Sequence, residues 1–356
     1  MSKVIVGLSG GVDSAVAALL LKNQGYEVIG VTMINYALDS SEIEDAREIA
    51  GTLGIKHVEI DMREEFKKSV IGYFVEEYLK GRTPNPCVMC NLLVKFESLI
   101  RVMEQEKADH IATGHYAEIV KLNNGRYTIA VNKSGKDQTY ALCRLSQYQL
   151  QHLLTPLAKY DKDEVRKIAL EAGIPVANKK DSQDICFVQK GKYFEFIKEY
   201  LATEGNEAGN KDRITNVDIS DKKGNFVDEE GNVLGTHNGI SHYTIGQRKK
   251  LGLALNKPVF VKELRPLSNE VVISTGGDVY FDELICDDTV YMAAEEFEEG
   301  ERLLAKIRYA HEGTYCRVEL NNTCKVIFEK PVRAVTPGQA IVFYKDERVY
   351  ASGIIC

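Results

Sequence analysis

Short apolar runs and amphipathic stretches alternate along the first 115 residues of the chain. A mostly apolar run at residues 3–8 is typical of a strand buried on both faces of a parallel sheet, and further strands are predicted at residues 27–33, 56–61 and 110–114. Stretches with helical periodicity occur between them, at residues 14–23, 41–53, 63–80 and 92–106. Repeated strand–helix–strand units with short connections predict an α/β fold built on a doubly wound parallel sheet.

The pattern changes after residue 116. A hairpin is predicted at residues 117–131 around Asn124 and Gly125, and helices are predicted near residues 146–153, 162–172 and 192–202. Residues 205–209 read as a domain edge, and a small insert domain follows. From about residue 267, short alternating strands, beginning with VVIST at 271–275, predict a C-terminal β-barrel. We therefore expect three domains, at residues 1–204, 205–266 and 267–356.

The composition is that of a globular protein of 356 residues, with 44% hydrophobic and 27% charged residues. No apolar run approaches the roughly 20 residues of a membrane-spanning helix. The first residues lead directly into a strand-like segment instead of a signal peptide. We therefore expect no membrane association and a cytoplasmic location.

Charge is distributed unevenly along the chain. The formal net charge is −7, which is not the basic balance of a typical nucleic-acid-binding domain. Residues 121–190, however, hold 12 Lys or Arg against 7 Asp or Glu, whereas residues 280–300 hold 8 acidic residues and no basic one. Local basic surfaces for a polyanion are therefore compatible with the overall acidity.

Residues 7–14, GLSGGVDS, lie between the first predicted strand and the first predicted helix. Glycines allow tight turns that aim backbone N–H groups at an anion, and the helix N-terminus adds its positive end. The loop has neither the lysine of a Walker motif nor the GxGxxG spacing of a dinucleotide site. The predicted phosphate site consists of Gly7, Leu8, Ser9, Gly10, Gly11, Val12, Asp13 and Ser14.

The SGGVDS segment resembles the pyrophosphate-binding loop (PP-loop) of the ATP pyrophosphatase superfamily. The resemblance implies that the loop holds the β- and γ-phosphates of ATP, with Asp13 near a Mg²⁺ ion. It also implies that ATP is split into AMP and pyrophosphate to activate an oxygen atom. The superfamily includes synthetases of small molecules and enzymes that modify tRNA, so the loop alone does not choose between them.

Three of the eight cysteines stand in chemically suggestive positions. Cys87 and Cys90 form a CxxC pair in the loop RTPNPCVMCN, and Cys186 lies in DSQDICFV. A structural zinc site would require four ligands, often two such pairs, and the chain has no second pair. Because Cys90 precedes a predicted helix, we expect the helix N-terminus to lower its pKa and favour the thiolate. The remaining cysteines are expected to pack in apolar surroundings: Cys143, Cys286, Cys316, Cys324 and Cys356.

The loop NPCVMCN resembles the NPDxxCN segment of the bacterial tRNA-specific 2-thiouridylases. Further blocks match that family in order, so that the resemblance covers essentially the whole chain: ATGHYA (112–117), KDQTYAL (136–142), DSQDICF (181–187), GxHxGxxxYTIGQRKxLG (235–252), RYAH (308–311) and PGQ (337–339). The resemblance implies thiolation of the wobble uridine of tRNA at C2, by adenylation of O2 and transfer of sulfur.

The resemblance also assigns roles to individual residues. Cys186 would carry a persulfide and Cys90 would be the nucleophile that attacks it, leaving a disulfide between the two. Met33 and Gly114 would line the adenosine side of the ATP site. The residues implied to contact tRNA or its target base are Asn85, Pro86, Cys87, His115, Lys136, Asp137, Gln138, Arg308, Tyr309 and Gln339. The implied cofactors are ATP and Mg²⁺, and the implied partners are tRNA and a sulfur-donor protein or another source of sulfide.

One position departs from the family pattern, because Cys87 stands where the family has Asp. Two routes follow. Either Cys87 is tolerated and the persulfide route operates without the aspartate, or Cys87, Cys90 and Cys186 hold a [4Fe–4S] cluster that carries the sulfur.

Two functions of other classes remain open at this stage. A PP-loop amide ligase or synthetase acting on a small molecule would not depend on Cys90 or Cys186. A non-catalytic RNA-binding scaffold would bind tRNA without turning ATP into AMP. The presence of Cys90 and Cys186 argues against the small-molecule ligase, and the intact SGGVDS segment argues against the non-catalytic scaffold.

Overall fold

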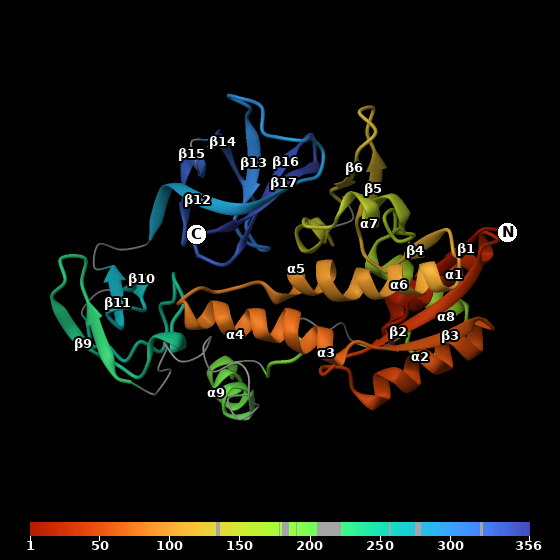
Figure 1. The fold of residues 1–356 in the computed structure, drawn as a ribbon, viewed down its shortest axis with the longest axis horizontal. Coiled ribbons are helices and arrows are strands. Elements are labelled where there is room, and N and C mark those ends of the chain that lie inside the picture. Colours follow the sequence, from red (N-terminus) through yellow and green to blue (C-terminus); the bar gives the residue numbers. More distant parts are fainter. Residues whose placement is uncertain are drawn as a thin grey trace.

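The computed structural model describes residues 1–132, 136–177, 179, 185–189, 191–204, 222–255, 258–274, 279–320 and 323–356. Figure 1 shows an α/β unit coloured red to green, a small teal sheet and a blue barrel. Two predicted features, the domain edge at 205–209 and the first part of the DSQDICF block at 181–184, lie outside the described residues. None of the described helices is long and apolar enough to cross a lipid bilayer.

The doubly wound parallel sheet confirms the predicted fold class. Its order is β3-β2-β1-β4-β7, and all neighbouring pairs are parallel. Central β1 is buried on both faces: Ile5 packs in one apolar cluster, and Val4 and Val6 pack in another. The bounds are β1 Lys3–Gly7, β2 Glu27–Ile34, β3 Lys56–Asp61, β4 His110–Ala112 and β7 Leu153–Leu154.

The helices of the α/β unit lie close to their predicted positions. In α2, Asp39 and Glu42 form a capping box at the start, and left-handed Gly54 ends the helix. The bounds are α1 Val12–Asn23, α2 Ser40–Leu53, α7 Gln147–His152, α8 Lys162–Glu171 and α9 Tyr193–Glu204, with 3₁₀ turns at Thr139–Leu142 and Ile240–His242.

Two longer helices each contain a π turn. The first consists of α3 Arg63–Phe66, the π turn Lys67–Ile71 and α4 Gly72–Leu79, and the second of α5 Pro86–Cys90, the π turn Asn91–Lys95 and α6 Phe96–Gln105. The second helix begins six residues before the predicted start at 92, because Asn85 caps it and Pro86 occupies its first position.

A closed barrel is formed by six of the described strands, in the order β12-β15-β14-β13-β16-β17, with β12 also pairing with β17. The predicted hairpin, β5 and β6, extends this sheet because β6 pairs with β17. The bounds are β5 Glu118–Lys121, β6 Tyr127–Ala130, β12 Tyr280–Tyr291, β13 Leu303–Lys306, β14 Thr314–Leu320, β15 Cys324–Arg333, β16 Ala340–Lys345 and β17 Arg348–Ile355.

The small sheet has the order β10-β11-β8-β9. Its strands are β8 Gly224–Val227, β9 Val233–His237, β10 Phe260–Arg265 and β11 Glu270–Ser274. The segment beginning at 271, which we expected in the barrel, instead pairs with β10 and lies parallel to β8. Alternation predicts a strand but not its sheet, and the short β10–β11 connection holds the segment here, beyond the predicted domain boundary at 266.

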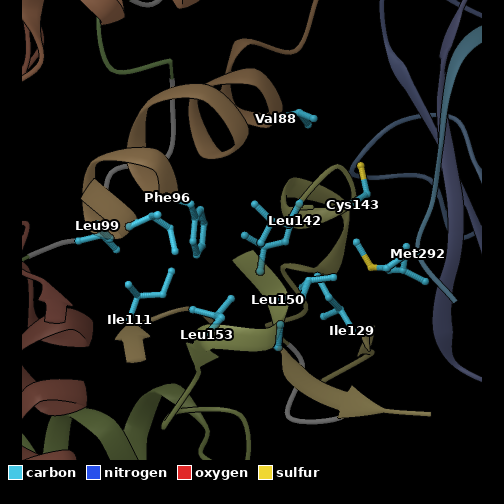
Figure 2. Packing of buried hydrophobic residues seen from close by; sticks show 14 of the residues in the cluster. Val88, Phe96, Leu99, Ile111, Ile129, Leu142, Cys143, Leu150, Leu153 and Met292 are labelled. Atoms are coloured by element: carbon cyan, nitrogen blue, oxygen red, sulfur yellow. The ribbon is translucent and has the colours of Figure 1, made fainter. Parts of the chain in front are cut away.

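The α/β unit and the barrel share one apolar core. Figure 2 shows Phe96 and Leu99 of α6 and Ile111 of β4 in the same cluster as Met292, which follows β12. Cys143 is fully buried in this cluster, in agreement with its expected packing role. The barrel is therefore held against the helix that carries the CxxC pair.

Candidate active site

The phosphate loop joins β1 to α1. Gly10 has φ of +68°, and a Cβ there would lie 2.4 Å from the carbonyl oxygen of Glu42. The Ser14 hydroxyl accepts the N–H of Ser9 at 3.2 Å and donates to the carbonyl of Gly11 at 2.9 Å. No side chain caps the start of α1, which leaves the amides of its first turn for an anion. The loop therefore has the form of a phosphate site.

The loop after β4 packs directly on the phosphate loop. A Cβ at Gly114 would lie 2.6 Å from the carbonyl carbon of Asp13 and 2.8 Å from the amide nitrogen of Ser14, so this position requires glycine. Met33 lies near the carboxyl end of β2, and Gly114 just beyond that of β4. Because β1 is paired with both strands, these two predicted adenosine contacts flank the phosphate loop at one edge of the sheet.

Asp13 is held by one hydroxyl and two ammonium groups. Its carboxylate accepts the hydroxyl of Tyr116 at 2.6 Å and the ammonium groups of Lys162 at 2.7 Å and Lys136 at 3.4 Å. Lys136 also lies over the ring of Tyr116. A carboxylate paired with lysine ammonium groups suits a site where Mg²⁺ can bind the carboxylate and phosphate oxygens can bind the ammonium groups.

A third lysine lies on the other side of the loop. The Lys179 ammonium group is 3.3 Å from the carbonyl oxygen of Gly10 and 2.6 Å from a carboxylate oxygen of Asp45. Sequence reasoning missed Lys162, Lys179 and Tyr116 as site residues. The positive excess of residues 121–190 was the available signal, because both of these lysines come from that segment.

The CxxC pair lies at the start of the second long helix. The side chain of Asn85 accepts the N–H of Cys87 at 3.2 Å. Because the helix begins at Pro86, Cys90 is a full turn inside it and not at its head. Burial raises the pKa of both thiols, against a lowering effect of Lys95. The expectation of a depressed pKa at Cys90 was therefore wrong.

The π turn explains why Lys95 lies near the thiols. In an α-helix, residues five apart point about 140° away from each other, whereas a π turn places them near the same face. Lys95 stands five residues after Cys90, across the π turn Asn91–Lys95. Its charge also acts on Cys186 and on His115. Sequence reasoning missed Lys95, because the π turn that positions it has no recognised sequence pattern.

Cys186 is brought to the CxxC pair by aromatic packing. The ring of neighbouring Phe187 meets Phe66 and Phe74 edge-on, with centroids 5.6 and 5.3 Å apart. The Cys186 side chain is accessible to solvent, but partial burial, together with the thiols of Cys90 and Cys87, raises its pKa to about 12. Three thiols from two distant segments thus form one electrostatic group.

The described side chains around the three thiols do not form a preformed metal-ion site. Across the described ranges, no three His, Cys, Asp or Glu side chains are grouped closely enough to hold a metal ion. Cys87, Cys90 and Cys186, as they are placed here, therefore do not form a preformed site for a single metal ion.

His115 follows Gly114 in the loop that packs on the phosphate loop. Its Nδ1 is 2.8 Å from the hydroxyl of Thr113, and its ring stacks on Phe96 at 5.9 Å. Burial, with the charges of Lys95 and Lys136, lowers the pKa of His115 to about 3. The imidazole is therefore neutral at physiological pH.

Asp137 and Gln138, predicted tRNA contacts, use their side chains within the fold. Asp137 accepts the N–H and the hydroxyl of Thr139 at 3.2 and 2.9 Å. The side-chain oxygen of Gln138 accepts the N–H of Tyr116 at 2.9 Å. Exposed Tyr309 of the barrel donates its hydroxyl to the carbonyl of Asp137 at 3.2 Å. The two predicted tRNA-contact segments thus adjoin each other and the phosphate loop.

The barrel also holds the loop that leads to Cys87. The Gln339 amide donates to the carbonyl of Thr83 at 2.7 Å, the Thr83 N–H donates to the carbonyl of Pro337 at 2.8 Å, and Arg82 donates to the carbonyl of Ile355. The Arg308 guanidinium donates to the carbonyl of Arg333 at 2.8 Å. Gln339 therefore connects the barrel to the thiol loop.

Comparisons with known proteins cover the three parts of the chain. Family models described as "tRNA methyl transferase HUP domain", "tRNA methyl transferase PRC-barrel domain" and "Aminomethyltransferase beta-barrel domain" match residues 2–190, 214–275 and 281–355. The chain is 49% identical to a tRNA-specific 2-thiouridylase MnmA of Lachnoclostridium phytofermentans, over 100% of this chain and 99% of that protein. It is 43% identical to the protein of the same name of Clostridioides difficile, over 99% and 98%.

Proposed function

Because the chain belongs to the tRNA-specific 2-thiouridylase family, we propose that it replaces O2 of the wobble uridine of tRNA with sulfur, using ATP. The observation that carries the proposal is that Cys90 and Cys186, 96 residues apart in sequence, come close together in the fold. Cys90 packs on the same apolar cluster as Ile185 and Phe187, the neighbours of Cys186, and its thiol contributes to the raised pKa of Cys186.

The first step activates the base. ATP binds with its β- and γ-phosphates on residues 7–14 and its adenosine between Met33 and Gly114. Lys136, Lys162 and Lys179 supply positive charge, and Asp13 would take part in holding a Mg²⁺ ion. The uridine O2 attacks the α-phosphorus, pyrophosphate leaves, and the adenylated oxygen becomes a good leaving group.

The second step transfers sulfur. A donor protein that itself carries a persulfide gives its outer sulfur to the Cys186 thiolate and keeps a free thiol, which leaves a persulfide on Cys186. The accessible side chain of Cys186 suits such delivery. The outer sulfur adds to C2 of the base while the Cys90 thiolate attacks the inner sulfur of Cys186. AMP leaves, and the products are 2-thiouridine and a Cys90–Cys186 disulfide, which an external thiol reduces. Lys95 favours the thiolate that this attack requires.

The substrate tRNA covers the face where the barrel meets the α/β unit. The base leaves the anticodon stack and enters between the thiols and His115, as in other enzymes that modify bases. Asn85, Pro86 and Cys87 border this entrance. Residues 136–138, with Arg308, Tyr309 and Gln339, border the same junction. With a tRNA substrate, we place the reaction in the cytoplasm.

The persulfide route fits the arrangement better than the cluster route. Without the family aspartate, Cys87 is a neutral thiol of raised pKa at the entrance. The persulfide route uses only the thiols of Cys90 and Cys186, whereas a cluster would also require Cys87 as a thiolate, against its raised pKa.

The test is formation of 2-thiouridine on an unmodified tRNA with a wobble uridine, under anaerobic conditions with ATP and Mg²⁺. Iron-stripped enzyme with a persulfide donor is compared with cluster-reconstituted enzyme supplied with sulfide. Activity of the stripped enzyme supports the persulfide route. Activity of the reconstituted enzyme alone would reassign Cys87, Cys90 and Cys186 as cluster ligands. No thiolation in either arm, with intact tRNA binding, would refute the proposed function.

A further inference from the structure

Three of the cysteines that the proposed reaction does not use line one cavity in the barrel wall. The cavity has a volume of about 490 Å³ and contains Cys286, Cys324 and Cys356. Its other lining residues are Ile285, Asp287, Thr289, Leu320 and Thr323. Sequence reasoning assigned these cysteines to packing, and only their gathering in the fold reveals a shared site.

Two of these thiols face each other across adjacent strands. Cys286 of β12 is directly opposite Cys324 of β15 in an antiparallel pair, and Figure 1 shows both strands in the blue barrel. Directly opposed residues in such pairs have Cα atoms about 4.5–5.5 Å apart. A disulfide requires about 4.4–6.8 Å. The backbone therefore already has the spacing of a cross-strand disulfide.

The two thiols have different roles in their contact. Cys286 is 1% exposed, and its thiol interacts with that of Cys324, so that the pKa of Cys286 is raised and that of Cys324 is lowered. The side chain of Thr289 also lowers the pKa of Cys324. Cys324 is 8% exposed and lines the cavity, so it is the more accessible of the two sulfurs to a small molecule there.

The third thiol differs from this pair. The backbone N–H of Cys356 donates a hydrogen bond to the carbonyl of Ile285 at 3.0 Å. Burial and the carboxylate of Asp287 raise the pKa of Cys356 to about 11. Cys316 is also buried in the barrel but does not line the cavity. The barrel thus holds a facing pair of cysteines, a third thiol of raised pKa in the same cavity, and a buried cysteine outside it, Cys316, that can serve as a control.

We propose that this cavity binds low-molecular-weight disulfides and that Cys324 and Cys286 form a redox-active dithiol there. The Cys324 thiolate attacks one sulfur of the small disulfide, forming a mixed disulfide and releasing one small thiolate. Cys286 gives its proton to that thiolate and attacks the Cys324 sulfur, which releases the second small thiolate. Two protein thiols are oxidised, and one small disulfide is reduced to two thiols.

The full chain, reduced and freed of reductant, is incubated with 2-hydroxyethyl disulfide, quenched in acid, denatured, alkylated and digested. Mass spectrometry is expected to find a Cys286–Cys324 linked peptide. In Cys286→Ser, the mercaptoethanol adduct is expected to accumulate on Cys324. In Cys324→Ser, modification of Cys286 is expected to be at least about tenfold slower. Cys316→Ser is the control and is expected to form the linked peptide at the wild-type rate.

The mapping of the unmutated chain does not depend on the folding of any variant. Absence of the linked peptide there would overturn the proposal. A Cys324–Cys356 link in its place would overturn the assignment of the pair. Formation of the link with hydrogen peroxide but not with 2-hydroxyethyl disulfide would show an oxidant-sensitive pair without a disulfide-binding site.

Discussion

At the nucleotide end of the site, residues 7–14 are closed by the hydroxyls of Ser9 and Ser14 and abutted by Gly114. At the thiol end, Cys90 and Cys186 come from segments far apart in sequence that meet through side-chain packing and a π turn. The nucleotide end is formed mainly by the backbone of one strand–loop–helix unit, whereas the thiol end depends on contacts between segments far apart in sequence. Binding of ATP and transfer of sulfur should therefore respond to different substitutions.

The largest effect is expected from substitutions at the thiol end, which should abolish sulfur transfer and leave ATP binding intact. Cys90→Ser or Cys186→Ser removes the sulfur chemistry, and we expect the rate of 2-thiouridine formation to fall at least about 10³-fold. Binding of ATP, measured by titration calorimetry, should remain as in the unmutated enzyme. Cys356→Ser, at an exposed thiol outside the site, is the matched control. Loss of ATP binding in either active-site variant would show that the ends are not separable.

The next substitution acts on the backbone at the nucleotide end. Gly114→Ala places a methyl group 2.6 Å from the backbone of Asp13, which displaces the phosphate loop. Because displacements of about 1 Å cost about 10²-fold in rate, we expect such a loss in pyrophosphate release. Gly51→Ala in α2 is the control, since a Cβ there meets no atom within 4 Å. Equal activity of the two variants would contradict the close packing.

The third substitution removes one charge without changing the backbone. We expect Lys162→Met to raise KM for ATP about tenfold, because its ammonium group lies at the phosphate loop. Lys162→Arg should retain most of the affinity. Lys167→Met, on the same helix but exposed, is the control and should leave KM for ATP unchanged. An equal rise in KM at Lys167 would mean that the loss of any positive charge on this helix weakens ATP binding, and would contradict a specific role of Lys162.

The smallest effect concerns the thiol end. Burial raises the pKa of Cys90, so its thiolate fraction is small at neutral pH and grows as the pH rises. Lys95→Met removes a lowering influence. We therefore expect alkylation of Cys90 by iodoacetamide to slow about threefold at pH 8 and its pH curve to move upward. A curve that stays in place would show that Lys95 does not act on Cys90.

The sequence predicted the nucleotide end better than the thiol end for a physical reason. Apolar periodicity and the glycines of residues 7–14 are local patterns, and the parallel sheet and the loop follow from them. Lys162 and Lys179 reach the loop from segments more than 140 residues away. The position of Cys90 was misjudged because the cap at Asn85 outweighed the apolar pattern that begins at residue 92.

The barrel shows the same limit. The alternation of apolar and polar residues correctly predicted strands in this region. It does not specify which strands pair, and the segment that forms β11 was therefore expected in the barrel instead of the small sheet. The facing of Cys286 and Cys324 depends on the register of β12 and β15, which single-strand patterns do not contain.

The hairpin β5–β6 has a consequence for how this gene can change by recombination. It belongs to the matched HUP segment, yet its strand β6 lies along β17 and its Ile129 shares a core with Val342 and Val349 of the barrel. A crossover that replaced only the C-terminal part would join a foreign barrel to this hairpin and leave mismatched apolar surfaces. Exchange of barrels between lineages should therefore be rare, and the hairpin and β17 should be inherited together.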